Sequence, residues 1–162
     1  MNAIELLKSQ HRAVEKLFDQ IDKAKTAGAK QKLFDQLADS LAVHAAIEEH
    51  QFYPAARAKR TEGMLFEALE EHVGIKRVIK DLMDIAADDP TFDAKIKVLS
   101  EQVEHHVGEE EKDLFPKVKK ILSAQELDIL AQNMTAEQSE LEENGEPRDA
   151  IAGETGEAAA LT

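Results

Sequence analysis

Four long segments of the chain place an apolar residue at every third or fourth position. An α-helix brings residues at that spacing onto one face, so each segment is expected to form an amphipathic helix. Only seven Gly and four Pro interrupt the 162 residues, and aromatic residues, which favour strands, make up 4%. The pattern therefore predicts an all-α chain in an up-down-up-down antiparallel four-helix bundle. The predicted stripes run over residues 4–21, 34–52, 65–82 and 92–114.

The C-terminal part divides into two expected pieces beyond a bundle domain at residues 1–122. Ser123 and Glu126 form a capping-box pattern, which predicts a short fifth helix over residues 123–143, packed on the bundle. Residues 144–162 contain Gly, Pro and acidic residues without any helical or strand period. We therefore expect this C-terminal tail to be disordered and acidic.

Composition narrows the classes of function. The chain has 20 Lys and Arg against 33 Asp and Glu, a formal net charge of −13, which disfavours binding to nucleic acid phosphates. It has no Cys, so thiolate metal sites and iron–sulfur clusters are excluded. No apolar run is long enough to cross a membrane, and the first residues do not read as a signal peptide. We expect a cytoplasmic protein, a monomer or weak homo-oligomer, that binds neither nucleic acid nor a membrane.

Six charged or titratable residues fall where the four stripes call for Leu or Ile. An unpaired carboxylate in a core costs several kcal/mol, and an unpaired imidazole also carries a cost. So many costly positions in one core indicate that something compensates them together. These residues are His11, His44, Glu48, His72, His106 and Glu110.

Counting from the predicted turns places these six residues in one layer of the bundle. His11 and His44 each lie about 14 residues from the first turn, which is about 21 Å along either helix. Glu48 and His72 lie about nine residues from the second turn, and His106 is about as far from the third turn as His72. The layer therefore collects one histidine from every helix.

An internal repeat sharpens this prediction. Residues 44–54 and 106–116 both read H-x-x-x-E-E, then three residues, two apolar residues and Pro. A lone histidine precedes the two copies by 33 and 34 residues. Each half thus supplies two His and one Glu, a set that suits a dinuclear centre with bridging carboxylates. Mixed imidazole and carboxylate ligands favour iron or manganese and are also compatible with zinc.

Neighbouring residues offer alternatives to this ligand set. Glu110 is preferred over Glu111 by the repeat, while Glu49 and Glu111 point about 100° further round their helices and could orient a histidine instead. His105 is an alternative to His106, although it does not continue the stripe. His50 lies on the outer face and is expected to be exposed to solvent.

Two further residues could reach the layer only if the helices were irregular. Tyr53 lies nine residues after His44, which is the opposite face of a regular helix, although Pro54 could disturb that geometry. Lys76 follows His72 by four residues and is expected to extend to solvent.

The two H-x-x-x-E-E copies, ending in Phe-Tyr-Pro and Leu-Phe-Pro, resemble the hemerythrin-like, HHE cation-binding family over about residues 1–120. This resemblance implies a non-haem di-iron protein that meets dioxygen, nitric oxide or peroxide, with a role in oxidative stress. It implies two iron ions, Fe2+ or Fe3+, joined by an oxo or hydroxo bridge and held by the six residues above.

The chain departs from the oxygen-carrying hemerythrins at two points. The carriers have a second histidine four residues after the one in the third helix, where this chain has Lys76. They also end with H-x-x-x-x-D, whereas here Glu110 and Glu111 follow His106. The resemblance therefore favours turnover of oxygen species, most concretely a catalase-like decomposition of peroxide. The alternative is an iron-binding or iron- and oxygen-sensing module without turnover.

Overall fold

The structure is a computed structural model that describes residues 1–162, and every regular element in it is helical. The predicted all-α class is therefore confirmed. No helix is both long enough and apolar enough to cross a membrane. The long helices are α1 (Ala3–Lys23), α2 (Ala27–Ile47), α4 (Glu62–Met83), α5 (Phe92–Glu109) and α7 (Ala124–Glu143).

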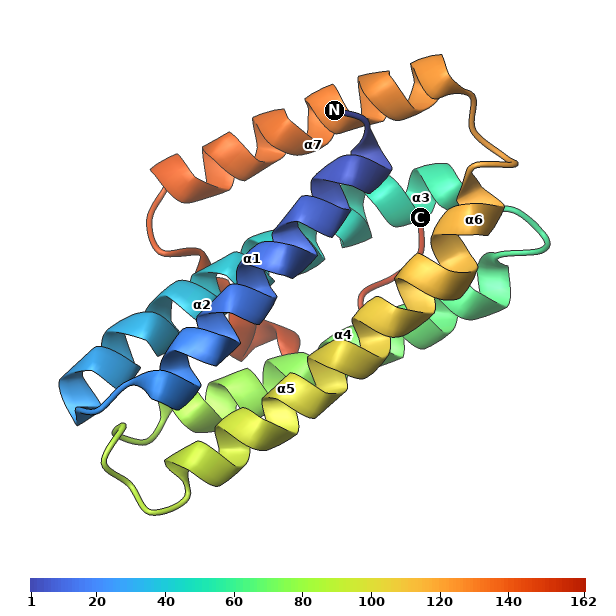
Figure 1. Cartoon of the computed structure of the whole chain (residues 1–162). Helices are drawn as coiled ribbons and strands as arrows, with labels where there is room; N and C mark the ends of the chain where they lie inside the picture. Colours follow the sequence, from blue (N-terminus) through green and yellow to red (C-terminus); the bar gives the residue numbers. More distant parts are fainter.

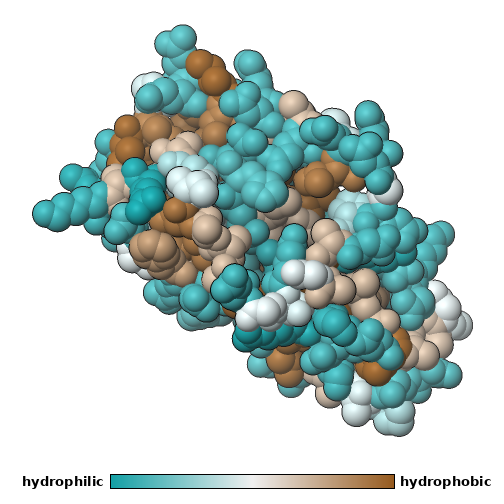
Figure 2. Space-filling model, turned by 180° about the vertical axis from the view of Figure 1, so that it is seen from behind, coloured by the Kyte–Doolittle hydropathy of each residue, from teal (hydrophilic) through white to brown (hydrophobic).

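Four long helices form the body of the molecule, and consecutive ones run in opposite directions (Figure 1). Helix α1 packs along α2, and α4 packs along α5. Helix α7 lies across the outside of α1 and α2 (Figure 1). The surface seen from behind is mainly hydrophilic, and its apolar residues form separate small patches (Figure 2).

Helices α2 and α5 each continue through one widened turn of π-helix. Helix α2 leads into η1 (Glu48–Phe52) and then α3 (Tyr53–Ala56), and α5 leads into η2 (Glu110–Leu114) and then α6 (Phe115–Val118). In each wide turn a backbone N–H reaches the carbonyl five residues earlier, from Tyr53 to Glu48 and from Phe115 to Glu110. One extra residue in a turn rotates everything after it by about 100° relative to a regular helix.

A proline lies two residues after the end of each widened turn. Pro54 and Pro116 are the second residues of α3 and α6. Inside a regular α-helix a proline ring clashes with the carbonyl four residues earlier and lacks an N–H to donate. The wide turn accommodates this residue without ending the helix, so the two repeats have the same irregularity at the same place.

The fifth helix, α7, covers the segment that the sequence predicts and begins at the predicted capping box. Ser123 accepts from the backbone N–H of Glu126, whose side chain accepts from the N–H of Ser123, so the capping box is present. Helix α7 then runs for 20 residues and buries Leu127, Leu130 and Met134. It is therefore similar in length to α1, α2, α4 and α5 and not short, while its bounds agree with the predicted range.

The expectation of a disordered tail is wrong. Residues Pro147–Glu154 form a 3-10 helix, η3, that packs on α2 and α4, with Ile151 fully buried. Arg148 donates from its backbone N–H and its guanidinium to the two carboxylate oxygens of Asp39, at 2.9 and 2.8 Å. A single apolar anchor flanked by ion pairs has no period, which is why hydropathy patterning misses it.

The apolar core is divided into two clusters. One contains 18 buried residues, gathered around α3, α6 and the inner face of α7. The other contains 14 buried residues, of which 13 come from the opposite half of the four long helices and one is Ile151. The six polar residues of the predicted layer are buried as well, and the distances between their polar atoms place them together in the core.

Candidate metal centre

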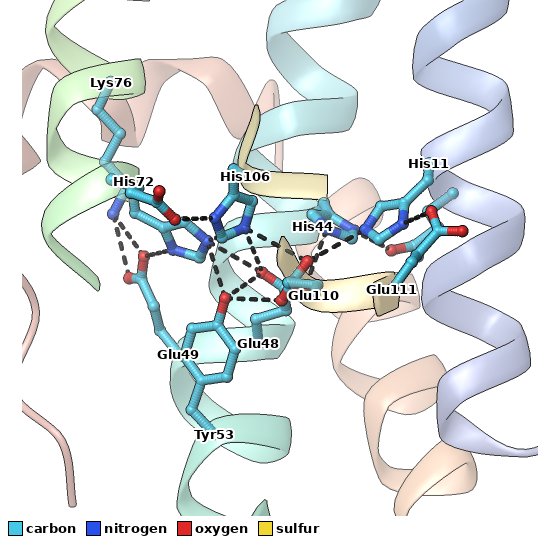
Figure 3. A network of polar contacts seen from close by, with 12 residues as sticks. His11, His44, Glu48, Glu49, Tyr53, His72, Lys76, His106, Glu110 and Glu111 are labelled. Atoms are coloured by element: carbon cyan, nitrogen blue, oxygen red, sulfur yellow. Dashed lines mark hydrogen bonds and ion pairs between the residues drawn. The ribbon is translucent and has the colours of Figure 1, made fainter. Parts of the chain in front are cut away.

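The structure brings all six predicted residues together in one buried layer (Figure 3). Their potential ligand atoms fall into two groups that share Glu48. The first group is His11, His44, Glu48 and Glu110, and the second is Glu48, His72 and His106. The carboxylate of Glu48 spans the two, with Oε1 3.0 Å from His44 Nε2 and Oε2 3.0 Å from His72 Nε2.

Four buried atoms in the first group lack a hydrogen-bond partner. They are His11 Nε2, His44 Nε2, Glu48 Oε1 and Glu110 Oε1. His11 Nε2 lies 3.2 Å from Glu110 Oε1, but the geometry is not that of a hydrogen bond. Buried polar atoms are almost always satisfied, so four orphans aimed at one point indicate an absent partner.

The second group is equally tight. His72 Nε2 and His106 Nε2 lie 3.1 Å apart. His106 Nε2 is 3.7 Å from Glu48 Oε2 and 3.4 Å from Glu110 Oε1. Glu110 is therefore within reach of both groups, as Glu48 is.

These distances fit metal ions. Metal–imidazole bonds are about 2.0–2.1 Å long for zinc and similar for its neighbours, so ligand atoms at right angles around one ion lie about 3 Å apart. Two imidazoles per group with two shared carboxylates suit iron, manganese or zinc. The buried His and Glu side chains are thus close enough together to bind a metal cation.

Each of the four histidines has a hydrogen-bonding partner at Nδ1, the ring nitrogen that faces away from the centre. Glu111 Oε2 lies 2.9 Å from His11 Nδ1, and Glu49 Oε2 lies 2.7 Å from His72 Nδ1. An acceptor at Nδ1 fixes the proton there and leaves the Nε2 lone pair pointing into the centre. Glu49 and Glu111 therefore orient histidines, one of the two roles that the sequence left open for them.

The remaining two histidines are held by residues that sequence reasoning did not single out. Gln10 Oε1 lies 2.7 Å from His44 Nδ1, and Glu71 Oε1 lies 2.8 Å from His106 Nδ1. The sequence carries a signal for them, because Gln10 and Glu71 directly precede His11 and His72 and so extend the repeat by one residue.

Tyr53 is part of the centre, and its expected position on the opposite helix face is wrong. The widened turn η1 rotates the helix after Glu48, which brings the Tyr53 hydroxyl into the layer (Figure 3). Its oxygen lies 2.9 Å from both Glu48 Oε2 and Glu110 Oε2, and 3.2 Å from His72 Nε2. One phenolic proton is thus shared among three acceptors of the centre.

Phe115 occupies the position that matches Tyr53 in the second repeat. Its ring stacks on His11, with centroids 6.0 Å apart and planes 6° from parallel. The Tyr53 ring lies beside His72 at a centroid distance of 5.5 Å. Because one repeat brings a hydroxyl and the other only a hydrocarbon ring, the two halves of the centre are chemically unequal.

Lys76 is buried, which corrects the expectation that it extends to solvent. Its Nζ donates to both oxygens of Glu49, at 3.1 and 3.0 Å, and lies 3.1 Å from Glu154 Oε1 in η3. Burial of a lysine needs paired charges, and here one carboxylate comes from the site and the other from the C-terminal segment. Lys76 thus supports the carboxylate that holds His72.

Residues 2–118 match the sequence profile described as Hemerythrin HHE cation binding domain. The chain belongs to this family. The crystal structure of a hemerythrin HHE cation binding domain-containing protein from Mycobacterium kansasii superposes on it with a TM-score of 0.77 at 25% identity, covering 95% of this chain and 91% of the other. A DNA nickase from Nostoc sp. strain PCC 7120 is 27% identical over 143 residues, 88% of this chain and 41% of the nickase. The chain thus spans less than half of that relative's length.

The two other histidines of this HHE domain lie outside the buried layer. His50 has a side chain that is 58% exposed and pairs with Glu137 of α7. His105 is 64% exposed and lies 3.3 Å from Glu71 and 3.1 Å from Glu109. His106 rather than His105 therefore faces the centre.

The charges of the HHE centre favour ionised carboxylates. Burial alone would raise the pKa of Glu48, but the surrounding His44, His106 and His72 hold it well below its usual value. Burial also lowers the pKa of His106, yet Glu110, Glu48 and Glu71 outweigh this and leave it well above its usual value. For Tyr53, burial and the charges of Glu110 and Glu48 all raise the pKa, so the phenol keeps its proton.

A small cavity of about 30 Å³ adjoins the HHE centre. The four histidines of the buried layer and Lys76 contribute its polar lining, and the rest is apolar. A cavity needs about 10–15 Å³ of such volume to hold one water, so this one has room for about two atoms of that size.

Proposed function

We propose that this HHE domain binds two iron ions and turns over a small oxygen species, most concretely hydrogen peroxide in a catalase-like reaction. The observation that carries the proposal is the pairing of two ligand groups around Glu48 with a small, mostly apolar cavity bordered by the same histidines. Dioxygen and nitric oxide are the other ligands of suitable size. The balanced reaction converts two hydrogen peroxide molecules into two waters and one dioxygen.

When bound, a pair of irons with an oxo or hydroxo bridge supplies the two-electron redox change that this reaction needs. The chain's own residues position that chemistry. His11 and His44 hold one side of the centre, and His72 and His106 hold the other, with Glu48 and Glu110 shared between them. The apolar lining of the cavity excludes bulk water from the reacting molecule.

Tyr53 is suited to hold the proton that peroxide cleavage consumes. Its hydroxyl lies 2.9 Å from each shared carboxylate, and its raised pKa keeps the proton on the phenol oxygen. A positioned proton donor contributes about 10²–10⁴-fold to such reactions. In this proposal Tyr53 donates within the layer, and Glu48 and Glu110 keep the hydroxyl aimed at the centre.

A sensing module without turnover is the second candidate, because residues behind the histidines also contact α7 and η3. Gln10, which holds His44, donates to Gln138 of α7 at 2.9 Å. Lys76, which supports Glu49, pairs with Glu154 of η3. In this second proposal, metal or ligand binding at the centre changes the position of α7 and the C-terminal segment, and a partner protein binds one of the two positions.

Binding to nucleic acid is not part of the proposal. The nickase name belongs to a protein of which this chain spans 41%, and a net charge of −13 opposes binding to phosphates. We propose a cytoplasmic protein, a monomer or weak homo-oligomer, without a nucleic acid or membrane partner.

The first experiment is metal analysis of aerobically purified protein from iron-replete cells, with its visible spectrum and oxygen evolution from hydrogen peroxide. We expect two irons per chain, oxo-bridge charge-transfer bands and oxygen release. Two irons without oxygen release would favour the sensing module. Zinc or no metal in the protein would overturn the redox function.

A further inference from the structure

The small cavity beside the centre has one wall that the four long helices do not supply. Thirteen of its fourteen lining residues belong to α1, α2, α4 and α5. The remaining residue is Ile151 of η3, which is fully buried and packs with the second core cluster. The C-terminal segment therefore closes a space that would otherwise be bounded by the bundle alone.

Polar contacts hold this wall on both sides of Ile151. Before it, Arg148 binds Asp39 of α2 through two hydrogen bonds. After it, Glu154 lies 3.1 Å from Lys76 Nζ on α4. Arg77, also on α4, donates to the carbonyls of Thr155 and Gly156 at 2.8 and 3.2 Å, so η3 is attached to two different helices.

We propose that Ile151 sets the upper size of the ligand that reaches the metal centre. This inference rests on the proposed function, because it concerns the molecule which that centre would turn over. With Ile151 in place the cavity of about 30 Å³ admits two small atoms, as in hydrogen peroxide. An alkyl group on the peroxide needs the space that the Ile151 side chain fills.

A substitution in this segment can change the size limit of the cavity without changing the residues of the metal centre. Ile151 contributes no atom to either ligand group, whereas every other apolar wall residue lies on a helix that also carries a ligand histidine. A substitution at Ile151 therefore enlarges the cavity while leaving the helices that hold the centre unchanged. Ile151 is thus a specificity-determining residue rather than a catalytic one.

The first test uses the whole 162-residue chain without metal. Xenon binding, followed by ¹²⁹Xe NMR, should be stronger in Ile151→Ala than in the unsubstituted protein, with Ile151→Val between them, because xenon enters apolar cavities. Val98→Ala is the control, since Val98 is exposed and does not line the cavity, so its truncation leaves no new buried space. A xenon signal in Ile151→Ala no stronger than in the unsubstituted protein would overturn the proposed wall.

The second test uses iron-loaded protein and two peroxides. We measure the rate with tert-butyl hydroperoxide relative to the rate with hydrogen peroxide; two alkyl hydroperoxides give two alcohols and one dioxygen. The ratio should rise about tenfold or more in Ile151→Ala and stay unchanged in Val98→Ala. An unchanged ratio in Ile151→Ala, with hydrogen peroxide still consumed, would overturn the size limit.

The two tests separate this inference from the proposed function. If the iron-loaded protein consumes no peroxide, the proposed turnover fails, and azide and phenyl azide titrations of the ferric form then replace the rates. Tighter binding of the bulky ligand by Ile151→Ala alone would still support the size limit. Equal selectivity in all variants would overturn it.

Discussion

The two sides of the centre differ in the residues that hold His44 and His106 at Nδ1. His44 is held by the amide of Gln10, while His106 is held by the carboxylate of Glu71. A carboxylate at Nδ1 makes an imidazole a more basic ligand than an amide does. The side formed by His72 and His106 thus has two carboxylate supports, and the other side has one.

Glu71→Gln should weaken metal binding on the His72–His106 side. We expect a loss of about 10- to 100-fold in the affinity of one of two metal ions, measured by competition with a chelator. Gln10→Glu should strengthen binding on the other side, and the double variant should exchange the two affinities. Unchanged stepwise affinities in all three variants would show that these partners do not tune the centre.

His44→Ala and Glu110→Ala should abolish tight metal loading, because each removes a donor whose atom lies unpaired in the layer. His50→Ala is the control on the same helical rod, since its side chain pairs with Glu137 at the surface. Metal content after purification measures the result. A loaded His44→Ala beside an empty His50→Ala would contradict the assigned helix faces.

Tyr53→Phe should separate metal binding from turnover. The substitution keeps all four histidines and both shared carboxylates, so we expect two metal ions to remain bound. Peroxide turnover should fall about 10²-fold or more if the phenol supplies a proton. The converse substitution Phe115→Tyr is the control, because it adds a hydroxyl on the His11 side without removing the first one. Full activity in Tyr53→Phe would exclude the phenol as proton donor.

At the scale of elements, the widened turns decide what the sequence could predict. The four candidate positions on α2 and α5 precede or begin the π-helical turns, and the other two lie on α1 and α4, which have no such turn. Counting along regular helices therefore placed all six in one buried layer. Tyr53 follows the extra residue, and the same counting placed it on the wrong face. The apolar periodicity does not reveal one inserted residue. The proline after each H-x-x-x-E-E copy is the sequence feature that indicates it.

The C-terminal segment marks a second limit of prediction from periodicity. Its order depends on pairs such as Arg148 with Asp39 and Glu154 with Lys76, whose partners are distant in sequence. Lys76 was expected in solvent for the same reason, because its two carboxylate partners are not its neighbours along α4. Long-range charge pairing leaves no local pattern.

Deleting Gln51 should convert η1 to a regular turn and rotate Tyr53 out of the layer. Tyr53 is the only tyrosine and the chain has no Trp, so its near-ultraviolet absorbance reports this residue alone. In the intact apo protein, burial and the two shared carboxylates keep the phenol pKa well above 10, and we expect that pKa to fall towards 10 after the deletion. Gln51→Ala, which keeps the chain length, is the control and should titrate like the unsubstituted protein.

For the whole molecule, stability should depend on pH and metal together. His11, His72 and His106 have folded pKa values above 6.5, so their contribution is complete below pH 6.5 and is lost as the pH rises through those values. Glu48, Glu49 and Glu71 have folded pKa values below 4.5. Their contribution to the free energy of unfolding is therefore complete above pH 4.5 and is lost as the pH falls through the folded pKa values. The metal-free protein should therefore be most stable between pH 4.5 and 6.5.

Metal should reverse this trend above pH 6.5, because ligation requires neutral imidazoles and releases their protons. Free metal at about 100 times its dissociation constant stabilises the folded state by about 2.7 kcal/mol. For a chain of this size, that corresponds to roughly 5–10 °C in Tm. Thermal unfolding from pH 5 to 9, with and without anaerobic Fe(II), measures both effects, and His44→Ala controls for metal bound elsewhere. A metal-free Tm that rises from pH 6.5 to 9 would contradict the charge balance of the centre, since the histidines would then gain nothing from their protons in the folded state.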